Sequence, residues 1–185
     1  MRLTLVLLTV LACWQGRAQD LAQPPSAALS FSRSVSVPLN AVQLYHAASE
    51  AYTWTFGKEP GAKMLLTDKA TGTIKGTARM NFRSAMLTGR EETMGTVSYV
   101  VLAQVSAGEC RITVTELIHT GNKNTSRGGI HLKQLVRNDD QVYPAGGMGR
   151  SNLIRVHREL REASTTHITG LLQAFEARLR ASLDR

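Results

Sequence analysis

The residues best suited to chemistry lie in the stretch PAGGMGRSNLIR, residues 144–155. Its glycines precede an arginine and then a pattern typical of a helix start, where free backbone N–H groups can hold a phosphate, sulfate or carboxylate. The residues that would form this anion contact are Gly147, Gly149, Arg150 and Ser151. The stretch lacks the Gly-Lys-Ser/Thr end of a P-loop and the parallel βαβ surroundings of a dinucleotide site. The alternative is a flexible connector, with Ser151 or Asn152 as the N-cap of the helix.

The histidines and serines do not suggest an active site. The five histidines are His46, His119, His131, His157 and His167. None of them pair at a metal-ligand spacing on one helix face, and no cysteine or carboxylate cluster joins them. His157 and His167 fall near the apolar stripe of a predicted helix, where a hydrogen-bonded, half-buried histidine is the commoner arrangement. Because there is also no nucleophile elbow, we expect no catalytic residue, no metal and no other cofactor.

The first residues, MRLTLVLLTVLACWQGRA, have the form of a secretory signal peptide. Arg2 precedes an apolar run that is shorter than the roughly 20 residues of a membrane-spanning helix, and no later segment approaches that length. We therefore predict a signal peptide over residues 1–18, a polar tether over residues 19–28, and an exported protein that is periplasmic or extracellular.

A second processing route is compatible with the same residues. Val10-Leu11-Ala12-Cys13 resembles a lipobox, in which Cys13 would be lipidated and would anchor the protein to the outer membrane. Under either route Cys110 has no disulfide partner within the mature chain, so the fold must be stabilised by packing. Cys110 lies on the apolar side of a predicted strand, which indicates a buried small hydrophobe.

The charge is basic, with 22 lysines and arginines against 14 acidic residues and a formal net charge of +8. Outside the cytoplasm, a basic surface meets anionic lipid, lipopolysaccharide or cell-wall polymer more readily than nucleic acid. Plain solubility is the alternative. The last predicted helix carries five arginines interleaved with glutamates, typical of either a solvated face or a docking surface: Arg155, Arg158, Arg161, Arg178 and Arg180.

The elements that position these residues follow from hydrophobic periodicity. Alternation predicts a first strand over residues 29–37, with Arg33 interrupting its apolar side, and Asn40 can cap a helix that runs to Phe56. Two predicted hairpins follow, with strands over residues 64–67, 73–82, 97–105 and 110–114. Residues 120–150 form a long variable loop in which IHLKQLV could form a short element. From Ser151 the pattern is helical, and Gly170 leaves one bent helix or two shorter ones open.

This order, β-α-β-β-β-β-α, predicts an α+β fold: an antiparallel sheet of about five strands with helices on one face, in a single domain over residues 29–185. The sequence resembles the secreted bacterial family called domain of unknown function 4468 over about residues 30–120. The resemblance is carried by RSVSVPLNAVQLYHAASEAYTWTF with Trp54 near its end, by TDKATGTIKGTA and by CRITV. It implies a TATA-binding-protein-like (TBP-like) fold and an exported location, but no activity. Nucleic acid is not an expected partner, because the polar sheet face offers few apolar wedges.

The leading hypothesis is therefore a non-enzymatic binding or scaffolding domain of the cell envelope, whose partner is an anionic envelope component or another envelope protein. One alternative is a small-ligand carrier or enzyme with a pocket between the sheet and the last helix, covered by residues 120–150. A second alternative is a lipoprotein subunit of an envelope complex, anchored through Cys13.

Overall fold

The computed structural model describes residues 28–87 and 89–182. The predicted signal peptide, the tether as far as residue 27 and the candidate lipidation residue Cys13 lie outside the described residues. Among the described residues, no helix is both long enough and apolar enough to cross a membrane.

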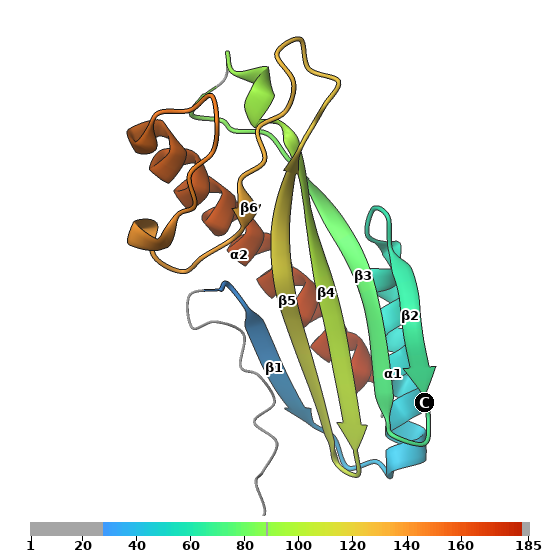
Figure 1. The fold of residues 1–185 in the computed structure, drawn as a ribbon. Coiled ribbons are helices and arrows are strands. Elements are labelled where there is room, and N and C mark those ends of the chain that lie inside the picture. The colour runs from blue at the N-terminus through green and yellow to red at the C-terminus, as the bar shows by residue number, and fades with distance from the viewer. Residues whose placement is uncertain (1–27, 88, 183–185) are drawn as a thin grey trace, which may run out of the picture.

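The described chain forms one antiparallel sheet and two long helices (Figure 1). The strands are β1 (Phe31–Ser36), β2 (Lys63–Asp68), β3 (Thr73–Phe82), β4 (Gly95–Ser106), β5 (Glu109–Gly121) and β6 (Lys133–Gln134). The sheet order is β1-β5-β4-β3-β2, and β6 pairs with β5. The helices are α1 (Ala41–Trp54) and α2 (Arg150–Ala181), with short 3-10 turns η1 (Phe56–Lys58), η2 (Glu91–Thr93) and η3 (Asp139–Gln141). The predicted α+β architecture is confirmed, and β6 is the short element expected within IHLKQLV.

Helix α1 begins where the sequence predicts. The side chain of Asn40 accepts a hydrogen bond from the backbone N–H of Gln43 at 2.9 Å, and the Gln43 side chain accepts one from the Asn40 N–H. This reciprocal pair is a capping box, which satisfies two backbone donors at the helix start. The helix ends at Trp54, two residues before the predicted end, and Phe56 belongs instead to the 3-10 turn η1.

Strand β5 runs seven residues beyond its predicted end at Val114 because a bulge changes the phase of its alternation. The register with β4 shifts between Ser98 and Val100, and Glu116 takes the left-handed conformation with φ of 55°. Buried residues therefore fall at even positions before the bulge and at odd positions after it, where Leu117 and His119 are buried. The prediction assumed strict alternation of buried and exposed residues, so it ended the strand where the bulge reverses that alternation.

Helix α2 is one continuous helix of 32 residues, which decides between the two alternatives for this segment. A Cβ added to Gly170 would meet no atom within 4 Å, so no crowding forces a break there. The predicted N-caps Ser151 and Asn152 are wrong. The helix begins at Arg150, and Gly149 is its N-cap without any side-chain hydrogen bond.

Both helices pack on the same face of the sheet, which we call the covered face (Figure 1). Buried side chains of α2, among them Leu160, Ile168 and Phe175, pack into the same hydrophobic core as the strands. Arg33, the polar interruption in β1, forms an ion pair with Glu176 of α2, so its charge is compensated. Cys110 is fully buried as predicted, and burial raises the pKa of its thiol to about 12, which leaves it unreactive.

The other face of the sheet, which we call the open face, carries no helix in the part of the chain that the structure describes (Figure 1). In β3 the exposed or half-buried residues Thr73, Lys75, Thr77, Arg79 and Asn81 alternate with buried ones. The polar side predicted for this strand is therefore confirmed.

Candidate functional site

A cleft of about 570 Å³ lies where β3 ends, β4 begins and β5 ends. The sheet register places Asn81 opposite Thr96 and Thr96 opposite Thr120, so three polar side chains form a row across the open face. Asn122, Arg83 and Lys123 add to the same lining. We call these six residues the basic cleft. Amide and hydroxyl groups in a row can exchange hydrogen bonds with a polar ligand, and the two cations give the cleft a preference for anions.

Two glycines in register allow the chain to close tightly around the cleft. Gly95 pairs with Gly121, and a Cβ on Gly95 would lie 2.3 Å from the carbonyl oxygen of Thr120. A Cβ on Gly121 would lie 2.6 Å from backbone atoms of Gly129 and Ile130. Because neither glycine has a side chain, the loop that follows β5 can fold directly onto the ends of the strands. Its contacts are backbone hydrogen bonds from Asn122 to Met94, at 2.7 Å, and from Ile130 to Glu92, at 2.8 Å.

Arg83 and Lys123 are both exposed, and among the described residues neither has an ion-pair or hydrogen-bond partner. Free cations on a concave polar surface concentrate anions near it. An arginine can bind phosphate, sulfate or carboxylate oxygens through two parallel N–H groups, and a lysine adds a point charge. The arrangement is therefore suited to hold an anionic group.

His119 lies directly behind the cleft and supports it. Its Nδ1 accepts the backbone N–H of Leu132 at 3.3 Å, which assigns the ring proton to Nε2, an atom close to the position a Cβ of Gly95 would take. The ring is 1% exposed and packs edge-on against Phe82, with centroids 5.9 Å apart. Burial lowers the pKa of His119 to about 4, so the imidazole is neutral at neutral pH. Its role is to fix the end of β5.

The two histidines of α2 differ from each other. His167 matches its prediction, because it is 34% exposed and its Nε2 lies 2.6 Å from Oε2 of Glu59. For His157 the prediction of a half-buried ring is wrong. The residue is fully buried, and the backbone of Gln134 lies against its ring. Burial lowers the pKa of His157 as well. No group of three potential metal ligands occurs in the part of the chain that the structure describes.

The predicted anion contact lies at the start of α2, where the structure brings its four residues together. Gly147 has φ of 81°, a conformation that favours glycine, and Gly149 is the N-cap. The guanidinium of Arg150 donates to the carbonyl oxygen of Asp140 at 3.4 Å, and Arg90 donates to the carbonyl oxygen of Gly147 at 3.2 Å. The glycine loop is thus a turn held by two arginines, and anion binding by Gly147, Gly149, Arg150 and Ser151 stays a prediction.

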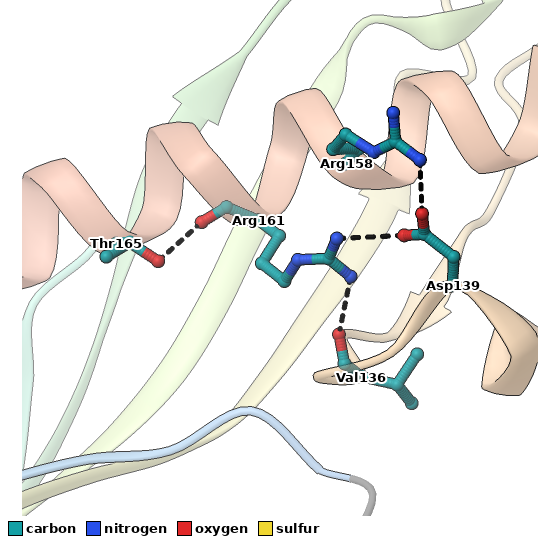
Figure 2. Close-up of polar contacts among 5 residues, drawn as sticks. All are labelled: Val136, Asp139, Arg158, Arg161 and Thr165. Carbon is teal, nitrogen blue, oxygen red and sulfur yellow. Dashed lines mark hydrogen bonds and ion pairs between the residues drawn. The ribbon is translucent and has the colours of Figure 1, made fainter.

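Most arginines of α2 contact groups within the protein, which the sequence pattern did not reveal. Arg158 and Arg161 both form ion pairs with Asp139 of η3, the latter at 2.8 Å (Figure 2). Arg161 also donates to the carbonyl oxygen of Val136 at 3.3 Å (Figure 2). Further along the helix, Arg180 pairs with Glu176, and Arg178 lies over the ring of Trp54. These contacts attach the loop before α2 to the helix, and Asp139 is shared by two of its arginines.

These features define a class of domain: a TBP-like α+β fold whose helices cover one sheet face and leave the other open. Residues 31–120 match the family model described as domain of unknown function (DUF4468) with TBP-like fold, so this stretch of the chain is similar to the DUF4468 family.

Two solved structures share the fold. The chain is similar to a DUF4468 family protein from Bacteroides ovatus, with a TM-score of 0.53 and 15% identity over 83% of this chain and 89% of that chain. It is also similar to a TBP-like protein from Parabacteroides distasonis, with a TM-score of 0.51 and 10% identity over 84% of this chain and 97% of that chain. No curated protein matches the chain.

Proposed function

We propose that this protein is an exported, non-enzymatic binding domain of the cell envelope, and that the basic cleft holds an anionic envelope component. The observation that carries the proposal is a pair of cations, Arg83 and Lys123, that have no partner among the described residues and lie at a polar cleft of about 570 Å³ on the open face. The signal-peptide pattern of residues 1–18 supports export, which brings the cleft to lipopolysaccharide or an anionic cell-wall polymer.

The chemistry of the cleft favours a glycan that carries phosphate, sulfate or carboxylate groups. Arg83 and Lys123 would bind the charged groups through charge-assisted hydrogen bonds. Asn81, Thr96 and Thr120 would exchange hydrogen bonds with sugar hydroxyls, because amide and hydroxyl groups both donate and accept. The cleft opens onto an uncovered sheet face, so a polymer can enter it without a change in the fold.

The alternative of a pocket between the sheet and α2 is not favoured by the packing. Leu160, Ile168 and Phe175 of α2 are fully buried in the hydrophobic core, where side chains fill the space that such a ligand would need. The lipoprotein alternative depends on Cys13, outside the described residues, and labelling of the protein with a radioactive fatty acid in cells tests it.

The proposal is tested by measuring the affinity of purified protein for lipopolysaccharide and for an anionic cell-wall polymer by isothermal titration calorimetry. The double variant Arg83→Ala/Lys123→Ala should lose at least about tenfold in affinity per cation, since each charge-assisted hydrogen bond contributes about 1.5–3 kcal/mol. The matched control is Arg155→Ala/Lys69→Ala, which removes the same charge away from the cleft and should bind like the parent. Equal losses in both double variants would show that net charge, and not the cleft, causes binding.

A further inference from the structure

Strand β2 forms one edge of the sheet (Figure 1). All of its residues are exposed except Asp68, which is half-buried. Among the described strands it pairs with β3 only, so the backbone groups of its outer edge face solvent. It also carries three consecutive exposed hydrophobic residues: Met64, Leu65 and Leu66 are 45%, 56% and 48% exposed. An open, hydrophobic edge is a template for a further strand.

A bulge in β2 decides which of its side chains share a face. Met64 lies opposite Gly76 and Leu66 lies opposite Lys75, so Leu65 is the extra residue between them. Lys63 lies opposite Thr77 and Asp68 opposite Thr73, and both partners belong to the open face. Without the bulge, residues five positions apart would point to opposite faces. The bulge therefore places Lys63 and Asp68 on the same face, at the two ends of the strand.

This arrangement makes β2 complementary to a second copy of itself. When two β2 strands run antiparallel with Leu65 opposite Leu66 of the other copy, Lys63 of each copy lies opposite Asp68 of the other. Met64 then lies opposite Thr67, and these two residues also share a face because they pair with Gly76 and Ile74. Opposite charges on directly opposed residues stabilise a strand pair, whereas the like charges of a parallel arrangement would repel.

The charged groups are available for this contact. Lys63 is exposed and has no ion-pair partner among the described residues. Asp68 Oδ1 accepts the backbone N–H of Ala70 at 2.9 Å, and its Oδ2 accepts the hydroxyl of Thr71 at 2.8 Å. These bonds hold the carboxylate in place at the strand end, where it keeps free lone pairs for a lysine. A bulge often discourages strand addition, but here it is the feature that brings the two charges into register.

We propose that β2 is a dimerisation edge, at which a second copy of this chain adds its own β2 in the antiparallel register that pairs Lys63 with Asp68. The contact is isologous, because the same residues contribute from both copies and a two-fold axis relates them. That axis is perpendicular to the sheet, so the two sheets continue into one another and both open faces point the same way. The dimer would thus present two basic clefts to one polymer, which raises avidity without any new contact to the ligand.

The proposal is tested by analytical ultracentrifugation of the purified protein over a range of concentrations, without any ligand, so the outcome is independent of what the cleft binds. The parent should shift from monomer to dimer mass as concentration rises. Leu65→Lys, which adds a charge at the centre of the edge, should stay monomeric and should melt at the temperature of the parent at low concentration, where the parent is also monomeric. The matched control Ile118→Lys changes a 41% exposed hydrophobic residue on β5 and should dimerise like the parent.

The register has its own test. On a Cys13→Ser background, an equimolar mixture of Met64→Cys and Thr67→Cys proteins should form disulfide-linked dimers on oxidation far more than either variant alone. A parent that stays monomeric at every concentration would overturn the proposal. So would a Leu65→Lys variant that still dimerises, or cross-linking that is no greater in the mixture than in the separate variants.

Discussion

The cations of α2 and those of the basic cleft differ in what they contact. Arg158 and Arg161 hold Asp139, so their charge is used within the protein (Figure 2). Arg83 and Lys123, at the open face, have no such partner among the described residues. The arginines that hold Asp139 lie on the helix that packs on the covered face, whereas Arg83 and Lys123 lie at the open face. A basic composition alone does not separate these two uses of charge.

The largest expected effect is a loss of stability when a buried side chain on the covered face is removed. Phe175→Ala removes a fully buried ring from the covered side and should lower the free energy of unfolding by about 3–5 kcal/mol. Ile118→Ala, on the open face, should cost less than about 1 kcal/mol because its side chain is already 41% exposed. Urea denaturation measures both. Similar losses would mean that the open face is covered by something in solution.

The next effect concerns pH. The pKa of His119 is about 4 in the folded protein and about 6.5 when unfolded, so the unfolded chain binds more protons between these values. The stabilising contribution is complete above about pH 6.5 and is lost as pH falls towards 4, to the extent of about 2–3 kcal/mol. Melting temperatures between pH 7 and pH 4 should show this loss.

The variant His119→Asn sharpens the same prediction, because its amide oxygen can still accept the N–H of Leu132. It should flatten the pH dependence of the melting temperature between pH 6.5 and pH 4, with the part due to His157 remaining. If the melting temperature of His119→Asn depended on pH as steeply as that of the parent, groups other than His119 would cause the pH dependence.

A smaller effect distinguishes the arginines of α2 from one another. Arg161 is 19% exposed, pairs with Asp139 and donates to the carbonyl oxygen of Val136. Arg161→Ala should therefore cost about 1–2 kcal/mol of stability. Arg155→Ala removes an exposed arginine of the same helix and should change stability by less than about 0.5 kcal/mol. Thermal denaturation measures both variants. Equal shifts of the two melting temperatures would contradict the expected difference between Arg161 and Arg155.

The smallest effect is a stabilisation. Gly170 lies within α2, and an added Cβ would meet no atom within 4 Å. Gly170→Ala should raise the free energy of unfolding by about 0.5–1 kcal/mol, because alanine loses less backbone entropy in a helix. A lower melting temperature would show that α2 needs the glycine, as a bend or as a contact with another molecule.

Periodicity in the sequence was enough to predict elements whose pattern does not change along their length. The alternation of Thr73–Phe82 gave β3 its observed bounds and its polar side, and Asn40 marked the start of α1. The second half of β5 could not be predicted, because the bulge at Glu116 reverses the alternation. The signal peptide, the tether and Cys13 lie outside the described residues and stay predictions.

The candidate site was harder to predict because its parts are distant in the chain. Its residues come from the ends of three strands, which only the folded sheet brings together: Asn81 and Arg83 from the end of β3, Thr96 from the start of β4, and Thr120 and Lys123 from the end of β5. No short motif contains them, whereas the glycine stretch before α2 is conspicuous in the sequence and proves to be a turn held by Arg90 and Arg150. The ion pair between Arg161 and Asp139 could not be predicted either, because Asp139 lies in the loop before the helix and only the fold brings the two residues together.

A single binding titration can compare one cation from each of these two regions. Affinities of Arg83→Ala and Arg158→Ala for lipopolysaccharide would be measured at low and high salt, because an ionic contact loses strength as salt rises. Arg83→Ala should bind at least about tenfold more weakly than the parent, and its affinity should depend less on salt, while Arg158→Ala should bind like the parent. Equal affinities of the two variants at both salt concentrations would contradict this prediction.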